Sequence, residues 1–145
     1  MRRSARAVLL DDNGRLVTIR RTRPGQPPYW TSPGGGVEPT DRTHEAAVER
    51  VLREELGARA RVGPQVLLLS IPEAAGVSVQ HFFLCRLLSI DPGLRTGPEY
   101  TGPVRGYELD RIAMSELADL DLRPVALKAL ITANMSVLIA DLPPA

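Results

Sequence analysis

One segment of the chain, residues 43–56, has the spacing of an amphipathic helix. Its apolar residues follow one another at intervals of three and four, which places them on one helix face, and they are Ala47, Val48, Val51, Leu52 and Leu56. Gly57 comes next, in the position where glycine commonly ends a helix. Segments with strand character occur earlier and later in the chain, so the fold must combine this helix with a sheet.

The rest of the chain predicts an α+β fold, a mixed α/β/α sandwich. Strands are expected at Ala7–Leu10, Leu16–Arg20, Gln65–Ile71, Val77–Leu88 and Tyr107–Ile112. The first two form a hairpin, whose Asn13-Gly14 pair is expected to supply positive φ values.

Loops and helices complete this prediction. A Gly- and Pro-rich loop is expected from Gly25 to Thr40, and a second loop from Asp91 to Gly106. A short helix is expected at Met114–Leu120 and a longer one from Arg123 to Met135, with Pro124 in its first turn. We expect the residue 43–56 helix on one face of the sheet and the last helix on the other.

Length, charge and cysteine content restrict the class of protein. The 145 residues fit one domain, residues 1–145. A net charge of +1 gives no general attraction to nucleic acid or membranes, so we expect neither partner. The single cysteine, Cys85, permits no internal disulfide and suits a reducing compartment. No window approaches the ~18 apolar residues of a membrane span, so a cytoplasmic protein is expected.

Two adjacent glutamates near the C-terminal end of the predicted helix indicate a cation site. Glu54 and Glu55 lie where the helix dipole disfavours negative charge, so a positive partner is expected. The preceding residues Gly34–Gly36 allow the backbone to approach a ligand closely. Mg²⁺ and Mn²⁺ take oxygen ligands of this kind. The alternative is that both glutamates are surface charges paired with Arg50 or solvent.

These residues together resemble the motif of the Nudix hydrolase family. That motif is Gly, five residues, Glu, seven residues, then Arg-Glu-aliphatic-any-Glu-Glu-any-Gly-aliphatic. Here Gly35 begins it, and its second half is filled by Arg50, Leu52, Glu54, Glu55, Gly57 and Ala58. The resemblance covers Trp30 to Ala58. It implies a Nudix-like fold, a central mixed sheet flanked by helices, and hydrolysis of a diphosphate bond.

Three features depart from the family pattern. Asp41 stands where the first Glu is expected, and eight residues, not seven, separate it from Arg50. Val51 replaces the Glu of the Arg-Glu pair, which family members use as metal ligand or base. Position 51 shares a helix face with Glu54 and Glu55. Because a positioned base contributes roughly 10²–10⁴-fold, we expect weakened activity. The alternative is that Val51 is an ordinary core residue.

The resemblance implies a set of site residues. Catalytic roles are expected for Arg50, Glu54, Glu55 and Glu99, and metal ligands from Gly34, Glu54, Glu55 and Glu99. Glu99 is assigned by its loop position past the helix, and the alternative is a solvated loop residue. Substrate contacts are expected from Arg20, Arg21, Arg23 and Trp30, the arginines through bidentate phosphate binding. The alternatives are an exposed strand end for the arginines and a packing role for Trp30.

The expected function is metal-dependent hydrolysis of a nucleoside diphosphate linked to another moiety, with Mg²⁺ or Mn²⁺ and a water nucleophile. The partner is then a small nucleoside diphosphate derivative, and a homodimer is compatible with the family. Because of Val51, the alternative is a catalytically inactive module that binds a nucleotide or metabolite. A third interpretation is an accessory protein that acts on a non-nucleotide phosphate ester.

Overall fold

The computed structural model describes residues 1–96 and 106–145. Within these residues, eight strands form one sheet: β1 (Arg2–Leu10), β2 (Leu16–Arg21), β3 (Tyr29–Thr31), β4 (Gly34–Gly36), β5 (Ala58–Glu73), β6 (Gly76–Ile90), β7 (Tyr107–Ile112) and β8 (Leu122–Arg123). The strand order is β5-β6-β1-β2-β3-β8, with β4 beside β1 and β7 beside β2. The β1/β6 and β3/β8 pairs are parallel and the others antiparallel, which confirms the expected mixed sheet.

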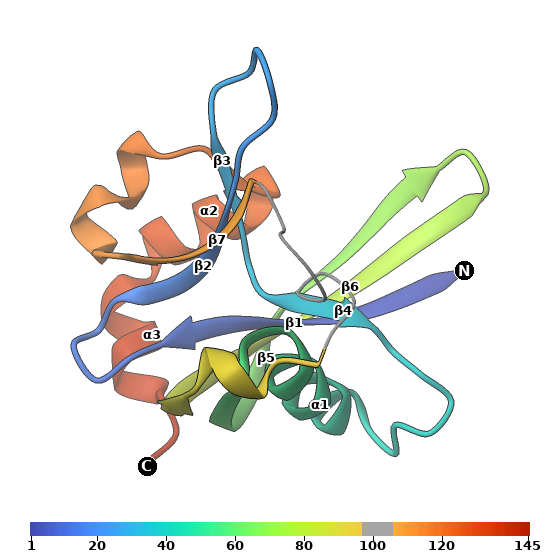
Figure 1. The fold of residues 1–145 in the computed structure, drawn as a ribbon, viewed down its shortest axis with the longest axis horizontal. Helices are drawn as coiled ribbons and strands as arrows, with labels where there is room; N and C mark the ends of the chain where they lie inside the picture. The colour runs from blue at the N-terminus through green and yellow to red at the C-terminus, as the bar shows by residue number, and fades with distance from the viewer. Residues whose placement is uncertain (97–105) are drawn as a thin grey trace.

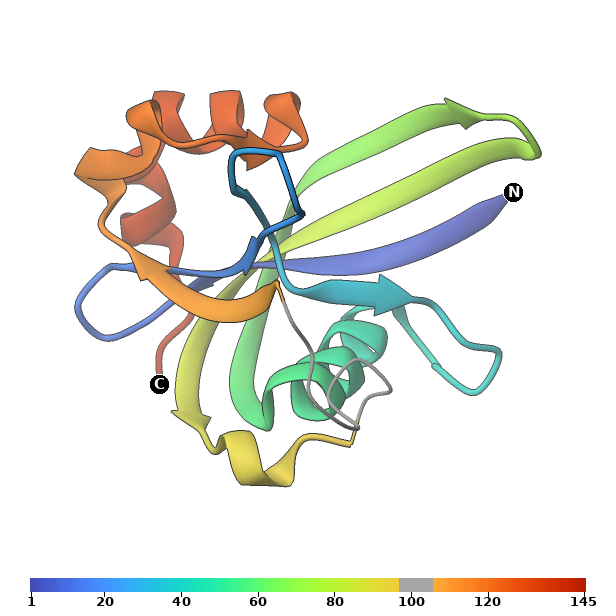
Figure 2. The same cartoon turned by 45° about the horizontal axis from the view of Figure 1, so that its top comes forward.

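Helices cover both faces of this sheet (Figures 1 and 2). Helix α1 (His44–Leu56) packs with Ala5, Ala7 and Leu9 of β1 in one apolar cluster. Val8 and Leu10, on the other face of β1, belong to a second cluster with α2 (Val125–Ala133) and α3 (Met135–Asp141). Because strand side chains alternate between faces, α1 and α2 lie on opposite sides, as predicted. Within the described ranges, no helix has the length and apolar character that crossing a membrane requires.

The ends of α1 agree with the sequence prediction. Thr43 is the N-cap, and its hydroxyl accepts a hydrogen bond from the Ala46 backbone N–H at 3.0 Å. Gly57 is the C-cap with φ of 63°, and its N–H donates to the Arg53 carbonyl at 2.9 Å. These two caps fix the length of the helix that carries Glu54 and Glu55.

The predicted hairpin is present, with Leu9 opposite Val17. One detail of its turn was wrong: Gly14 has φ of 71°, but no residue other than glycine has a positive φ in the described chain, so Asn13 does not. The Asp11 carboxylate holds the turn instead, since it accepts hydrogen bonds from the backbone N–H groups of Asn13 and Arg15, both at 2.9 Å.

Several predicted boundaries were also wrong. The Gly/Pro-rich segment contains β3 and β4, because neighbouring strands supply their hydrogen bonds. β5 extends over Ala58–Glu73 because it pairs with β6 almost throughout. The expected C-terminal helix is two helices separated by Asn134. Pro124 occupies the N-cap position of α2, one residue before the first turn in which it was expected. The predicted short helix is a 3₁₀ helix, Met114–Asp119, and another, Pro92–Leu94, lies in the expected second loop.

Candidate functional site

Arg50 joins the β4–α1 loop to the helix. Its guanidinium donates two hydrogen bonds of 2.9 Å to the two carboxylate oxygens of Asp41, and one of 2.9 Å to the Gly36 carbonyl. It also donates to Glu54 Oε2 at 3.0 Å and lies 3.4 Å from Glu38 Oε1. These contacts use the planar donor geometry that distinguishes Arg from Lys. They hold the Arg50 side chain between the loop and the helix, and its expected catalytic role stays a prediction.

The ion pair is electrostatically tight. The Arg50 guanidinium, by hydrogen bonding and by its charge, lowers the pKa of the Asp41 carboxyl, and the Glu38 backbone N–H, which donates to Asp41 at 2.8 Å, acts in the same direction. Hydrogen bonding to Asp41 likewise raises the pKa of Arg50. Both groups are therefore charged at neutral pH. Asp41 retains the carboxylate of the motif's first Glu, and this carboxylate anchors Arg50.

Val51 occupies the position of the missing glutamate and is 3 % exposed. A Cβ added to Gly35 would lie 3.3 Å from Val51 Cγ1, so the two residues pack closely. Val51 is therefore part of the contact between α1 and β4, which agrees with its interpretation as a core residue. A glutamate side chain at this position would extend from the contact between α1 and β4, one turn before Glu54 and Glu55.

The Gly34 carbonyl points away from β1. Ala7 N–H donates to the Pro33 carbonyl at 2.9 Å and Val37 N–H to the Arg3 carbonyl at 3.0 Å. In the antiparallel register between these bonds, Gly34 opposite Arg6 is a non-hydrogen-bonded pair. The Gly36 carbonyl points the same way and meets Arg50. Gly34 therefore presents its oxygen on the outer side of β4, as a metal ligand there requires.

The metal set expected from sequence is only partly within the described chain. Glu54 and Glu55 lie side by side in the last turns of α1, and both are partly buried. Glu99 lies outside the described residues. Among the residues that are described, no group of three or more His, Cys, Asp or Glu side chains is arranged to hold a metal ion. Because Val51 replaces a glutamate of the motif, the site has one carboxylate fewer than the motif provides.

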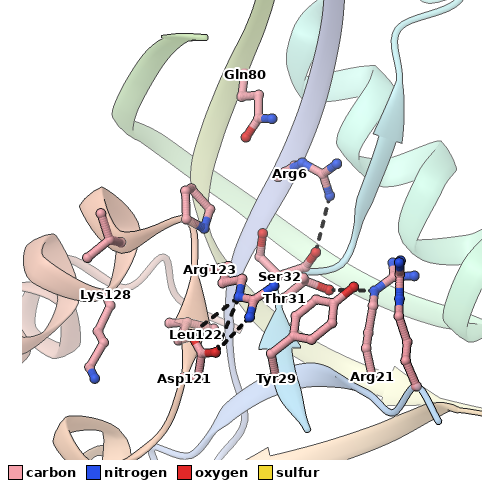
Figure 3. A pocket seen from close by; sticks show the side chains of 13 residues that line it. Arg6, Arg21, Tyr29, Thr31, Ser32, Gln80, Asp121, Leu122, Arg123 and Lys128 are labelled. Atoms are coloured by element: carbon pink, nitrogen blue, oxygen red, sulfur yellow. Dashed lines mark hydrogen bonds and ion pairs between the residues drawn. The ribbon is translucent and has the colours of Figure 1, made fainter. Parts of the chain in front are cut away.

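A cavity of about 750 Å³ opens where β1 and β2 diverge. Beyond the Leu9–Val17 contact, β1 pairs with β4, whereas β2 pairs with β3 and β7. Figure 1 shows β2, β3 and β7 leaving β1 at an angle. Figure 3 shows the side chains around the cavity, which come from β1, β2, β3, β6, β8, α2 and residues next to these elements. Its charged lining residues are Arg6, Arg21, Arg23, Arg123, Lys128 and Asp121.

Two of the four residues predicted to contact substrate line this cavity. Arg21 donates to Thr31 Oγ1 at 3.2 Å and lies 4.4 Å from the centre of the Tyr107 ring, and Arg23 is the second lining residue. Arg20 does not line it and lies 4.0 Å from Glu108 Oε2. Trp30, its partner across the β2/β3 pair, points the same way, because side chains alternate along a strand.

Trp30 agrees with its packing interpretation. It packs against the apolar cluster under α2, and its indole Nε1 donates to Asp110 Oδ2 at 2.8 Å. Four further residues line the cavity that were not predicted from the sequence: Arg6, Tyr29, Arg123 and Lys128. Only Arg6 had a local signal, as a charged residue inside an apolar strand. The others come from separate elements that the fold brings together.

The chain is similar to a known protein family and to solved structures. The family model described as the NUDIX domain matches residues 1–127. A NUDIX hydrolase from Nitrosomonas europaea has a TM-score of 0.70 at 18% identity, covering 98% of this chain and 92% of that chain. The MutT NUDIX hydrolase from Burkholderia pseudomallei is 26% identical, with a TM-score of 0.57 and coverage of 79% and 84%.

A third similar structure was solved with a ligand. It is the NUDIX domain of Shewanella oneidensis NrtR in complex with ADP ribose, 16% identical, with a TM-score of 0.65 and coverage of 93% of this chain and 87% of that chain. The comparison with curated proteins finds no match.

Proposed function

The chain belongs to the Nudix family, and we propose that it hydrolyses the diphosphate linkage of a nucleoside diphosphate joined to another group. The observation that carries this proposal is the position of the cation-lined cavity next to the segment Ser32–Gly34, which leads into the carboxylate-bearing motif. A cavity of about 750 Å³ is in the range of small-molecule sites. Its guanidinium groups suit phosphate oxygens.

A divalent cation fits the oxygen donors that the motif presents. We propose that Glu54, Glu55 and the outward carbonyl of Gly34 hold Mg²⁺ or Mn²⁺, since hard cations take oxygen ligands. Such an ion, when bound, lowers the pKa of water and polarises phosphoryl oxygens. Arg50 keeps Glu54 oriented through their 3.0 Å hydrogen bond. In the cavity, Arg21 and Arg23 bind the diphosphate and offset its charge.

Glu99 is the proposed source of the carboxylate function that Val51 lacks. This part of the proposal rests on the sequence, because Glu99 lies outside the described residues. Glu99→Gln is expected to lower kcat by at least tenfold with little change in KM, because a base acts in the transition state. Glu73→Gln, an exposed change on β5, is the control. An unchanged kcat would remove Glu99 from the site.

A phosphate-release screen tests the proposed activity. Dinucleoside polyphosphates, nucleotide sugars and ADP-ribose are incubated with the protein, with and without Mg²⁺ or Mn²⁺, and a phosphatase then releases phosphate from the monoesters that cleavage exposes. Nucleoside triphosphates, which a phosphatase would itself attack, are coupled to inorganic pyrophosphatase instead. We expect turnover only with metal, and its loss in Glu54→Gln/Glu55→Gln but not in Glu49→Gln, an exposed residue of the same helix. Equal release by wild type and the double variant would contradict the assignment.

A second candidate function is binding without turnover. Val51 at the position of the missing glutamate favours it, as does the hydrogen bond that ties Glu54 to Arg50. A module of this kind would bind nucleotides with a measurable Kd and release no phosphate in the same screen. The two candidates therefore give opposite results with one set of ligands.

A further inference from the structure

The long hairpin of β5 and β6 has one open edge. Among the described strands, β5 pairs only with β6, because the order of the sheet begins at β5. Figures 1 and 2 show this hairpin projecting from the body of the molecule, beside the start of β1. The outer edge of β5 therefore presents backbone N–H and C=O groups that no described strand satisfies. Such an edge is a template for pairing with another chain.

The register of the hairpin identifies the open backbone groups. A two-residue turn joins Glu73 to Gly76, so these two residues form a hydrogen-bonded pair. Hydrogen-bonded and non-hydrogen-bonded pairs alternate from there, which directs the N–H and C=O groups of residues 68, 70 and 72 to the outer edge. Pro72 agrees with this assignment, because a proline has no N–H and is tolerated where that group would face outward. The open donors are therefore the N–H groups of Leu68 and Ser70.

The side chains of this segment favour pairing. Residues 67–71 are Leu-Leu-Leu-Ser-Ile, with no charge and no proline, and the register shifts of β5 all lie before Leu67. Charges, prolines and bulges are the features that normally protect an edge strand. Leu68 is 56 % exposed, although it is a large apolar side chain. Covering this surface with a partner strand would be favourable.

Two copies of this strand fit one another about a two-fold axis at Leu69. In that antiparallel register, Leu68 of each copy lies opposite Ser70 of the other, so the open N–H groups of both residues meet C=O groups. Leu69 lies opposite itself and Leu67 lies opposite Ile71, which places aliphatic side chains against each other. An axis at Ser70 would instead place Leu67 opposite Glu73. The apolar pattern therefore selects the axis at Leu69.

Opposite charges lie at the two ends of this strand, on one face of the hairpin. Arg61 is opposite Arg86 of β6, which shares a face with Leu84 under α2, and Glu73 shares that face with Leu69. The Arg61 guanidinium has no hydrogen bond or ion pair within the described part of the chain. An antiparallel partner brings the basic end of one strand to the acidic end of the other.

The register with its axis at Leu69 makes these charges neighbours. Along β6, the partners of Arg61 and Glu73 lie six and four residues from the partner of Leu69. Arg61 of each copy therefore lies diagonally across from Glu73 of the other copy, within reach of a long side chain. Glu73 contacts Arg2 of its own chain through Oε1 at 2.6 Å, and its Oε2 is left for this second contact. A parallel pairing would place arginine beside arginine.

We infer that the protein forms a two-fold symmetric dimer in which the outer edges of two β5 strands pair antiparallel about Leu69. The two sheets then continue into one another, and each copy gives the same residues to the contact. Residues 67–71 do not line the cation-lined cavity, so this inference is independent of the proposed function and is tested separately from it.

Sedimentation velocity of the full chain tests the dimer. Because the contact is small, we expect a reversible equilibrium of monomer and dimer with a Kd on the order of 10 µM. Leu68→Lys should weaken this Kd about tenfold, because a charge on an edge strand opposes pairing. Val137→Lys on α3 is the matched control, since Val137 is also 56 % exposed, and it should keep the wild-type Kd. A wild type that stays monomeric at about 1 mM, or equal Kd values for the two variants, would overturn the inference.

Cross-linking tests the position of the two-fold axis. Residues opposite each other in a non-hydrogen-bonded pair have Cα atoms about 4.5 Å apart, which a disulfide can span. Leu69→Cys should therefore form an intermolecular disulfide readily when oxidised glutathione is the oxidant. Ser70→Cys is the control, because Ser70 is exposed but lies opposite Leu68 and not opposite itself, and it should cross-link more slowly. The native Cys85 is buried and should not contribute. Cross-linking of Ser70→Cys as fast as that of Leu69→Cys would overturn the inference.

Discussion

Both carboxylate oxygens of Asp41 accept hydrogen bonds of 2.9 Å from Arg50, across eight intervening residues. The same guanidinium reaches the Gly36 carbonyl and Glu54. One side chain therefore connects the end of β4, the loop before α1 and the carboxylate region of the helix. The position and orientation of Glu54 depend on this connection.

Asp41→Asn should make this dependence visible in the pH profile of stability. Because Arg50 lowers the folded-state pKa of Asp41 from its usual 3.8, the stabilisation is complete above pH 3.8 and is lost as pH falls through the folded-state pKa. At neutral pH the free energy of unfolding of the variant should be about 1.5–3 kcal/mol lower than that of wild type. Urea unfolding between pH 7 and 2.5 should show the two proteins converging in acid. Glu45→Gln, exposed in the first turn of α1, is the control, and parallel curves for wild type and Asp41→Asn would contradict the role of the pair.

His81 should resist protonation in the folded state. Arg3 can only donate, so its Nη1, 2.9 Å from Nε2, makes Nε2 the acceptor and leaves Nδ1–H to donate to Gln65 Oε1 at 2.9 Å. Burial, then the neighbouring His44 and Arg3, lower the pKa of His81 below its usual 6.5. Stability should therefore be complete above pH 6.5 and be lost as pH falls through the folded-state pKa. An NMR titration should give a value below 6.5 that rises in Arg3→Gln, and a value at or above 6.5 in the wild type would refute the assignment.

Gly34 and Gly36 offer a comparison within one strand. A Cβ on Gly34 would lie 2.7 Å from the Ala5 carbonyl oxygen and 2.9 Å from Arg6 Cα, whereas nothing lies within 4 Å of a Cβ on Gly36. Gly34→Ala should therefore lower the free energy of unfolding by about 1–3 kcal/mol, as overpacking does. Gly36→Ala should be close to neutral. Similar melting temperatures for the two variants would show that β4 does not pack on β1 in this way.

Much of the fold follows from apolar spacing, and much of the site does not. The three- and four-residue spacing located α1 to within one residue, because its buried face is continuous. β3 and β4 have no such pattern, since their hydrogen bonds depend on β1 and β2, which are distant in sequence or separated by a loop. The motif placed both Asp41 and Arg50 in the sequence, but only the fold shows that their side chains form an ion pair. Three cations of the cavity, Arg6, Arg123 and Lys128, come from distant parts of the chain, and no sequence window contains them together.

Manganese binding should require the two glutamates of α1. Calorimetry should give a Kd for wild type that weakens at least tenfold in Glu54→Gln/Glu55→Gln, because both substitutions remove a negative oxygen ligand and keep the size of the side chain. Glu49→Gln, on the exposed side of the same helix, should bind as wild type does. The hydrogen bond from Arg50 to Glu54 competes with the cation, so moderate wild-type affinity is expected. Identical titrations of wild type and double variant would remove Glu54 and Glu55 as ligands.

Restoring the motif's glutamate, Val51→Glu, should raise hydrolysis. The new carboxylate would lie one turn before Glu54 and Glu55 on their face, where it can ligate a cation or accept a proton from water. The gain is expected to reach up to ~10²–10⁴-fold, and less if Glu99 already supplies the function. Val51 is 3 % exposed and packs against Gly35, so the variant would bury a carboxylate there. Without metal, its free energy of unfolding should fall by about 1–3 kcal/mol.

Val51→Gln is the matched control, because it has the size and polarity of the glutamate without its charge. It should lose similar stability and gain no activity. Bound Mn²⁺ should raise the melting temperature of Val51→Glu more steeply than that of wild type or Val51→Gln, because an added ligand tightens binding to the folded state. If Val51→Glu folds, binds Mn²⁺ and still releases no phosphate from any ligand in the screen, the hydrolase proposal is wrong. Binding without turnover would then be the function of this site, since restoring the motif's carboxylate would have restored no chemistry.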